Sequence, residues 1–229
     1  MATQRITFCK FKTTDAFNSN KMITSIQEKN ADDRYFVFNE QGTTYIRGSF
    51  YIERQQSDHR YNIISGEVEE IPFVKQVPLK FEIDISGQTI MIWGNRKFVP
   101  DLLTELSIAS ENSVVMDEIN VDFKKAVEKV AKTASIKISK MKILNVPIEA
   151  GILATCTVDA SALESPQSFI KKYIDNVIQI SITINDDYLD DGETTAISVT
   201  LYSSGSLVVY KDRDSISDET IDMLKSLIA

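Results

Sequence analysis

The spacing of apolar residues along the chain predicts many short β-strands. Where apolar and polar residues alternate, one face of a strand is buried and the other faces water. Residues 79–86 are the clearest case, because apolar Leu79, Phe81 and Ile83 alternate with charged side chains. The strands that this spacing predicts are residues 4–12, 34–39, 43–53, 60–70, 79–86, 89–94, 112–121, 135–145, 152–159, 177–184, 195–203 and 206–211.

Details of the same pattern predict where these strands turn or deviate. Glu40-Gln41-Gly42 is expected to join two strands as a hairpin. Gly66 is expected to form a bulge within residues 60–70. A change in the phase of alternation between Ile138 and Met141 predicts a second bulge. We also expect residues 152–159 to form a buried strand.

Apolar residues recur at helical spacing in five other segments. In each segment the apolar residues would form a stripe that faces the core. Pro100 and Pro166 stand in the first turn of two of them. The N–H groups of a first turn have no partner within the helix, so a proline there costs no helical hydrogen bond. The predicted helices begin near Ser19, Pro100, Asp122, Ser165 and Ser217.

This order of elements predicts an α+β fold with predominantly antiparallel β-sheets and four to five helices. Runs of strands come first, and most connections have hairpin length, which does not suit a doubly wound parallel sheet. Pro147 and Gly151 interrupt the pattern between two strands. We therefore expect a β-rich N-terminal domain of residues 1–147 and an α+β C-terminal domain of residues 148–229, packed tightly together.

Composition narrows the compartment in which the protein is expected to act. The chain has 229 residues, of which 43% are hydrophobic and 25% are charged, as in a globular protein. No apolar run reaches the length of roughly 18 residues that crosses a membrane, and the first residues lack the apolar core of a secretory signal. We expect a cytoplasmic protein without membrane attachment, in which Cys9 and Cys156 are reduced thiols.

Residues suited to catalysis are scarce. The single histidine, His59, lies in a stretch of polar residues that we interpret as a solvated loop. The glycine-rich motifs that bind nucleotide phosphates are absent. The acidic loop of residues 185–193 would place Leu189 and Ser198 at ligand positions of a calcium loop, so we interpret it as a solvated hairpin tip. We expect a protein that is not an enzyme, with no catalytic residue, metal or cofactor.

One arrangement keeps an enzymatic alternative open. Pro100-Asp101 is followed about twenty residues later by Asp122-Phe123-Lys124, which resembles the Pro-Asp and Asp/Glu-x-Lys pattern of metal-dependent nucleases. In such enzymes two carboxylates hold Mg²⁺ and the lysine stabilises charge near the attacking water. Here Asp101 opens a predicted helix and Asp122 precedes another, whereas that family places these residues on adjacent strands. A Mg²⁺-dependent nuclease remains an alternative.

Positive charge is concentrated in one short part of an acidic chain. The formal net charge is −8, with 25 Lys and Arg against 33 Asp and Glu, yet residues 122–142 hold seven lysines and only two acidic residues. We expect these lysines to form one exposed ridge that binds double-stranded nucleic acid or a nucleic-acid-processing protein complex, since each neutralised phosphate releases counterions. The lysines are Lys124, Lys125, Lys129, Lys132, Lys137, Lys140 and Lys142.

One unit of the chain resembles a known family. Phe81-Glu82-Ile83-Asp84-Ile85, Thr89-Ile90-Met91-Ile92-Trp93, Phe98 and Leu102-Leu103 form a strand–turn–strand–helix pattern. It is similar to the corresponding unit of RexA-like phage-exclusion proteins and of the B component of Kiwa defence systems, over residues 35–145. The resemblance implies a non-enzymatic, oligomeric, DNA-binding protein that acts in phage–host conflict or antiviral defence.

A different class of function fits the same composition. An acidic surface and exposed strand edges are also typical of a protein–protein interaction module or inhibitor. Homo-oligomerisation is compatible with this hypothesis and with nucleic-acid binding.

Overall fold

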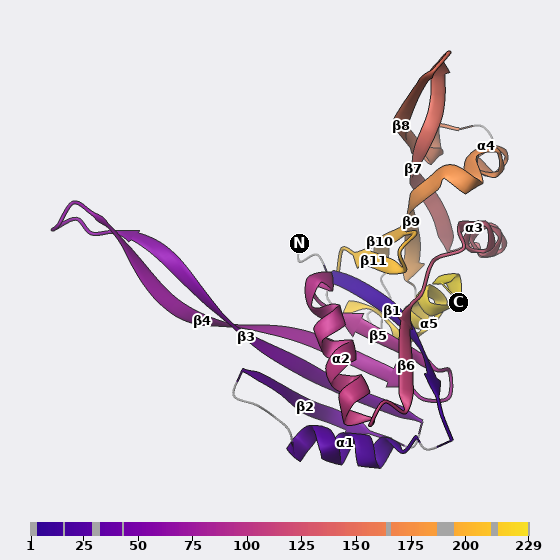
Figure 1. Cartoon of the computed structure of the whole chain (residues 1–229). Helices are drawn as coiled ribbons and strands as arrows, with labels where there is room; N and C mark the ends of the chain where they lie inside the picture. The colour runs from indigo at the N-terminus through magenta and orange to yellow at the C-terminus, as the bar shows by residue number, and fades with distance from the viewer. Residues whose placement is uncertain are drawn as a thin grey trace. The chain divides into compact units, whose positions relative to one another are not determined.

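The computed structural model describes residues 4–15, 17–28, 33–42, 44–163, 166–186, 195–211 and 215–228 (Figure 1). The chain divides into two compact units. The N-terminal unit comprises residues 11–116, and the C-terminal unit comprises residues 1–10 together with 117–229. Within the described residues, no helix is long and apolar enough to cross a membrane.

The N-terminal unit is built on four antiparallel strands and two helices. The strands pair in chain order and are β2 (Arg34–Gln41), β3 (Tyr45–Tyr61), β4 (Val68–Asp84) and β5 (Thr89–Trp93). Helix α1 (Ser19–Glu28) contacts helix α2 (Val99–Ala109), which follows the 3₁₀ turn η1 (Arg96–Phe98). Each α-helix buries one apolar stripe, as its spacing predicts.

The predicted strand–turn–strand–helix unit is confirmed. Leu79, Phe81 and Ile83 are all buried on one face of β4. The chain then turns where the Asp84 carboxylate accepts a hydrogen bond of 2.8 Å from the Gly87 N–H. Strand β5 returns beside β4, so that the alternation seen in the sequence corresponds to one buried face of the sheet.

The longest element is a hairpin that the sequence analysis did not predict. Strands β3 and β4 pair in continuous register from Tyr45↔Asp84 to Tyr61↔Val68. The predicted strand over residues 60–70 is wrong, since residues 62–67 form the turn of this hairpin and Gly66 adopts a φ of +73° there. The interpretation of His59 as a loop residue is wrong as well, because it pairs with Glu70 within β3.

The outer part of this hairpin extends beyond the body of the N-terminal unit (Figure 1). Strand β2 pairs with β3 only as far as Ile52, and β5 pairs with β4 only from Lys80. We call residues 53–76 the arm. Apart from Arg54 at its base, which contacts Asp101 of α2 and Phe98 of η1, it is a two-stranded ribbon without a third strand or a helix against it in the described part of the N-terminal unit.

The C-terminal unit contains seven strands, wholly or in part, and six of them pair in the order β1-β11-β10-β9-β7-β8, antiparallel where the register is described. Residues 4–10 of β1 and 117–118 of β6 belong to this unit, and β6 pairs with β1. The strands are β1 (Gln4–Thr13), β6 (Val114–Glu118), β7 (Ile136–Glu149), β8 (Ile152–Asp159), β9 (Val177–Asp186), β10 (Thr195–Tyr202) and β11 (Ser206–Val209).

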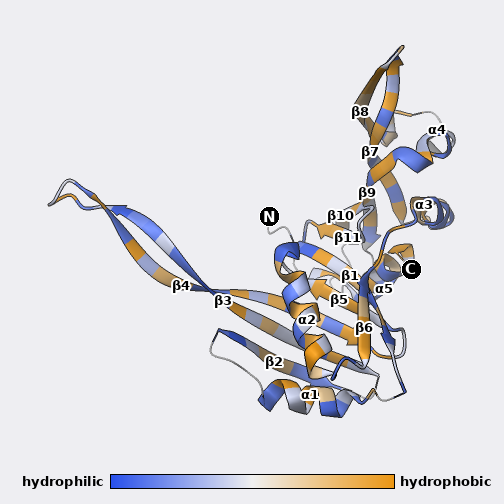
Figure 2. Cartoon of the chain, in the orientation of Figure 1, coloured by the Kyte–Doolittle hydropathy of each residue, from blue (hydrophilic) through white to orange (hydrophobic). Residues whose placement is uncertain are grey.

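Helices cover one face of this second set of strands. Helix α3 (Phe123–Lys132) contacts β7, α4 (Pro166–Tyr173) and α5 (Asp218–Ile228). On β9, Ile180, Ile182 and Ile184 are buried, whereas the residues between them are polar. Figure 2 shows this alternation of apolar and polar residues. Two 3₁₀ turns, η2 (Ala160–Ala162) and η3 (Ile174–Asn176), flank α4.

The fold class predicted from the sequence is confirmed. The described residues form an α+β fold with mostly antiparallel strands and five α-helices. The bulge predicted between Ile138 and Met141 is confirmed by a register shift between Ile138 and Lys140. Strand β8 has the predicted range, but its residues are exposed or half-buried, so the expectation of a buried strand is wrong.

The compact units differ in extent from the predicted domains. The prediction divided the chain into residues 1–147 and 148–229. In the structure residue 147 lies inside β7, and the β7–β8 hairpin belongs entirely to the C-terminal unit. The division into independently folding domains therefore stays a prediction. The acidic loop and the cap at Ser165 cannot be compared, because residues 187–194 and 164–165 lie outside the described residues.

Candidate functional site

Four of the seven candidate lysines lie on the exposed side of helix α3. The helix begins where the spacing predicts, and Asp122 caps it: its carboxylate accepts hydrogen bonds of 3.0 Å and 3.2 Å from the N–H groups of Lys124 and Lys125. Phe123, Val127 and Val130 form the buried stripe. At about 100° per residue, the four lysines fall within roughly 140° of the opposite side of the helix. These helix lysines are Lys124, Lys125, Lys129 and Lys132.

The other three candidates lie on strand β7. Lys137, Lys140 and Lys142 pair with Thr183, Ser181 and Gln179 of β9. Lys137 and Lys140 are exposed, and Lys142 is half-buried. We call these three residues the sheet lysines. They share the polar face of the strands, on which hydroxyl and amide side chains surround them.

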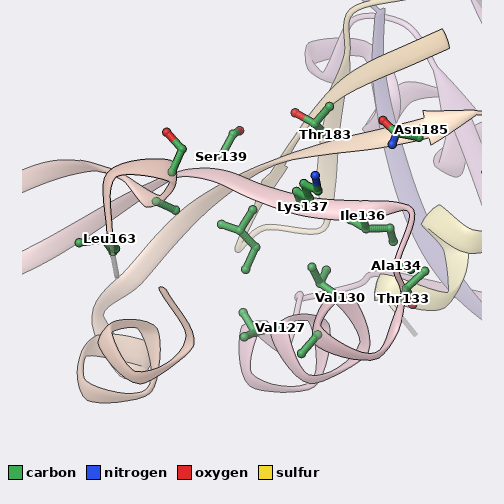
Figure 3. Close-up of a pocket in the computed structure, with 14 residues that line it drawn as sticks. Val127, Val130, Thr133, Ala134, Ile136, Lys137, Ser139, Leu163, Thr183 and Asn185 are labelled. Carbon is green, nitrogen blue, oxygen red and sulfur yellow. The ribbon is translucent and has the colours of Figure 1, made fainter. Parts of the chain in front are cut away.

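The structure does not place the seven lysines in one continuous ridge. Ile136 is buried on the face of β7 that α3 covers, and side chains alternate along a strand, so Lys137 lies on the other face. Figure 3 shows Val127 and Val130 pointing from α3 toward β7, whereas Thr183 and Asn185 point away from the helix. The helix lysines and the sheet lysines therefore form two groups on opposite sides of the strands.

The two groups also differ in their electrostatic surroundings. Within the described residues, none of the seven lysines forms an ion pair, although the Lys129 ammonium donates a hydrogen bond to the backbone carbonyl of Ser226 near the end of α5. Among the sheet lysines, Lys140 pairs across the strands with Asp159. Hydrogen bonds from Ser161, together with the charge of Lys140, hold the pKa of the Asp159 carboxyl below its usual range.

The residues of the nuclease alternative have structural roles. Asp122 is the cap of α3, and Asp101 lies in the first turn of α2, 3.6 Å from the guanidinium of Arg54. Both residues thus stand at helix starts and not on adjacent strands. No group of three or more His, Cys, Asp or Glu residues that could hold a metal ion occurs in the described ranges.

An open groove of about 880 Å³ lies between helix α3, strand β7 and the turn η2. Its lining is largely aliphatic, and the principal residues are Val127, Val130, Ile136, Ile138 and Leu163. Lys137 is the charged residue of the lining that the structure describes, and no carboxylate lines the groove there. Val127, Val130 and Ile136 are themselves buried, and the Lys137 side chain lies on the face of β7 away from α3, so these residues expose little surface to a ligand.

The arm is the functional feature that sequence reasoning missed. From Arg54 to Gln76 every residue except Asn62 is exposed, yet many of these residues are apolar. At the turn, the exposed fractions are 87% for Ile63 and 97% for Ile64. The other large apolar residues that the arm exposes are Tyr61, Val68, Ile71, Phe73 and Val74.

The arm cannot bury these side chains within itself. Cross-strand partners lie on the same face of a hairpin and pack on each other. Here Val74, Phe73 and Ile71 of β4 lie opposite Gln55, Gln56 and Asp58 of β3, and Val68 alone among the large apolar residues has an apolar partner, Tyr61. Full burial of the apolar groups must therefore come from outside the hairpin. The sequence contained a signal for this exposure. The apolar residues between Pro72 and Pro78 are flanked by prolines, which have no N–H to donate to a neighbouring strand and are therefore rare in central strands.

No protein-family model matches the chain, and the search of curated proteins found no match. The resemblance to RexA-like and Kiwa proteins therefore stays a hypothesis.

Proposed function

We propose that this chain is a non-enzymatic protein-interaction module that acts in the cytoplasm and uses the arm as its docking element. The observation that carries the proposal is the exposure of Ile63 and Ile64 at the end of a paired, two-stranded ribbon. Single exposed apolar residues are common on protein surfaces, but contiguous exposed apolar groups are typical of binding sites.

The length of the arm supports this assignment. A two-stranded hairpin is marginally stable on its own in water, and a hydrophobic face normally needs a further strand or a helix against it. The inner part of β3 and β4 has such cover, whereas residues 53–76 do not. A partner that covers the arm would supply the missing apolar contacts and stabilise the strand pairing.

The charge of the arm favours a polypeptide over a nucleic acid as this partner. Its acidic residues outnumber its basic ones, since Arg54, Arg60 and Lys75 are opposed by five carboxylates. Nucleic acids attract basic surfaces because phosphate contacts supply most of the affinity. The carboxylates belong to Glu53, Asp58, Glu67, Glu69 and Glu70.

A photo-cross-linking residue in place of Ile64 tests the proposal in cells that produce the full chain. We expect an adduct with a polypeptide, identified by mass spectrometry. The adduct should be lost when Tyr61 and Val68, which flank the turn, are both changed to Ser. The matched control places the same probe at Val37, which is exposed on β2 outside the arm. Adducts with nucleic acid alone, or equal adducts at both positions, would contradict the proposal.

Duplex nucleic-acid binding is the second candidate, and the helix lysines favour it. They share one exposed side of α3 and form no ion pair with the described carboxylates. Such a group would bind phosphates with little dependence on base sequence and with strong dependence on salt. The role in phage–host conflict that the resemblance implies belongs to this candidate.

Fluorescence anisotropy with a labelled DNA duplex separates this candidate from the first. Changing the four helix lysines to Gln should abolish binding at low salt, and changing the three sheet lysines to Gln should weaken it less, because Asp159 offsets part of their charge. No binding by the wild-type chain at low salt would eliminate this candidate.

A further inference from the structure

We propose that the partner binds the arm by strand addition, in which an extended, basic segment of another protein pairs with the free edge of β3 over residues 54–60. This inference rests on the proposed function of the arm and assigns the binding mode and the chemical class of the occupant. The added segment is a third strand beside the two-stranded ribbon, in line with β2.

The pairing of β3 with β4 shows which backbone groups of the arm point outward. In an antiparallel ladder, pairs that exchange two hydrogen bonds alternate with pairs whose N–H and C=O groups face away from each other. Pro72 has no N–H and lies opposite Ser57, so this pair belongs to the second kind. The N–H and C=O groups of Gln55, Ser57 and His59 therefore point away from β4.

A hydrogen bond at the base of the arm confirms this phase. The Glu53 N–H donates to the Asp33 carbonyl at 2.8 Å, on the β2 side of β3. Gln55 follows two residues later, so its N–H points to the same side. In the described ranges, the outward backbone groups of Gln55, Ser57 and His59 have no partner. The hydrogen-bonded line that β2 begins thus ends at Asp33, and the edge beyond it is free.

A row of such backbone groups fits one class of ligand. Groups on every second residue of a strand repeat about every 6.6–6.8 Å. An extended polypeptide offers donors and acceptors with the same repeat, which is the basis of strand addition at exposed sheet edges. The free stretch from Arg54 to Arg60 has the usual length of a strand. A third strand also supplies the support that a lone hairpin lacks in water.

The opposite edge of the arm does not offer such a row. The outward positions of β4 include Pro72 and Pro78, which have no N–H. Prolines on an edge strand oppose pairing with another strand. The outward positions of β3 in the arm contain no proline. The arm is therefore closed to strand addition along β4 and open to it along β3.

Charge complementarity favours a basic segment as the occupant. Residues 58–70, which form the outer end of the arm, carry four carboxylates and one arginine. Asp58 lies on β3 opposite the apolar Ile71 and forms no ion pair with the described residues. Opposite charges directly across two strands stabilise their pairing. A strand that places Lys or Arg opposite Asp58 is therefore favoured.

The two arginines of the same strand do not offset this preference. The Arg54 guanidinium lies 3.6 Å from the Asp101 carboxylate. Arg60 pairs across the strands with Glu69, on the same face of the hairpin. Each arginine thus has a carboxylate of the chain itself nearby, whereas Asp58 faces an apolar residue across the hairpin.

Two substitutions of glutamine by proline test the two edges of the arm. Gln55 and Gln76 are both exposed and both lie at outward positions, one on β3 and one on β4. A proline at either site leaves the β3–β4 hydrogen bonds intact, because the lost N–H faces outward. Gln55→Pro removes a donor from the proposed binding edge, and Gln76→Pro is the matched control on the closed edge.

The yield of polypeptide adduct from the photo-cross-linking residue at position 64 measures the outcome, in cells that produce the full chain. Gln55→Pro should lower this yield by roughly 10-fold or more, because it removes a hydrogen bond and leaves the partner's acceptor unpaired. Gln76→Pro should leave the yield unchanged.

A second pair of substitutions tests the charge of the segment. Asp58→Lys and Glu70→Lys change the net charge of the arm equally, but Glu70 lies on β4. Asp58→Lys should lower the adduct yield by roughly fivefold or more, because it places like charges across the new strand pair. Glu70→Lys should lower it less. The cross-linked segment, mapped by mass spectrometry, should contain more Lys and Arg than Asp and Glu.

Amide hydrogen exchange followed by NMR tests the wild-type chain without any substitution. The polypeptide that cross-links to position 64 is purified and added to the chain. The amides of Gln55, Ser57 and His59 should then gain more protection than the outward amides of Val74 and Gln76 on β4. Equal or greater protection on the β4 side would contradict strand addition to β3.

Four results of the cross-linking experiments would also overturn the inference. They are a yield that Gln55→Pro leaves unchanged, an equal loss for Gln55→Pro and Gln76→Pro, an acidic cross-linked segment, and an adduct between two copies of this chain. If a polypeptide adduct forms at position 64 in spite of Gln55→Pro, the inference fails alone and the proposed function survives. Both fail if that probe yields no polypeptide adduct.

Discussion

The inner and outer halves of the β3–β4 hairpin share one pair of strands and one register, but they differ in what covers them. In the inner half, residues 45–52 and 77–84, every second position is buried, and Phe50 and Phe81 are almost inaccessible. In the arm the pairing continues while nearly every side chain is exposed. Backbone pairing is thus equal in both halves, and only the inner half gains stability from burial.

This difference shows which part of the hairpin serves the fold and which part serves binding. Phe36 contacts Phe50 with ring centroids 4.6 Å apart and Phe81 at 6.0 Å, so the inner half forms an aromatic core with β2. In the arm, Ile71, Phe73 and Val74 lie opposite polar residues, and only Val68 lies opposite an apolar ring, that of Tyr61. Packing within the fold does not account for the exposed apolar side chains of the arm. We therefore assign the arm to contact with another chain.

The largest expected effect comes from truncating one aromatic residue in each half. Phe81→Ala should lower the free energy of unfolding by about 3–5 kcal/mol, because it leaves a cavity in the core. Phe73→Ala, at an exposed position of the arm, should change it by no more than about 0.5 kcal/mol. Urea denaturation of the dilute proteins measures both. Equal losses for the two variants would contradict the division of the hairpin.

An intermediate effect is expected where the inner half is tightly packed. A Cβ atom added at Gly48 would lie 2.8 Å from the carbonyl oxygen of Val37 and 2.9 Å from a ring carbon of Phe81. Gly48→Ala should therefore cost about 1–3 kcal/mol through overpacking. Ser57→Ala, in the outer half of the same strand, is the control and should leave the urea midpoint unchanged. A neutral Gly48→Ala would show that the inner half is loosely packed.

The smallest effect is expected at the base of the arm. The Arg54 guanidinium lies 3.6 Å from the Asp101 carboxylate and 5.2 Å from the ring centroid of Phe98. Because the pair is partly exposed, Arg54→Ala should cost only about 0.2–1 kcal/mol in thermal or urea unfolding. A loss above that range would mean that the base of the arm belongs to the core.

The parts of the fold that follow from local pattern could be predicted from the sequence. Leu79, Phe81 and Ile83 alternate with charges because one face of β4 is buried there, and Asp122 precedes an apolar stripe because it caps α3. The arm could not be predicted in this way. Residues 54–61 are polar on both faces, so they lack the alternation that marks a strand, and their strand conformation depends on pairing with residues distant in the chain.

The sequence predicted which lysines form the candidate nucleic-acid site, but not how the structure arranges them. The seven lysines are visible as a charge cluster in the sequence, yet a linear cluster does not show which face of a strand each side chain occupies. Ile136 packs toward α3, and this contact sends Lys137 to the other face of β7. The groove was not predictable, because α3, β7 and η2 come together only in the folded chain.

Amide hydrogen exchange of the full chain, followed by mass spectrometry with and without the polypeptide that cross-links to position 64, tests the central claim most directly. The account predicts that amides of residues 45–52 and 77–84 are protected in both samples. Amides of residues 53–76 should exchange fast in the chain alone and become protected when that polypeptide is present. Strong protection of the arm in the chain alone would show that the arm is stable without a partner and would contradict the account.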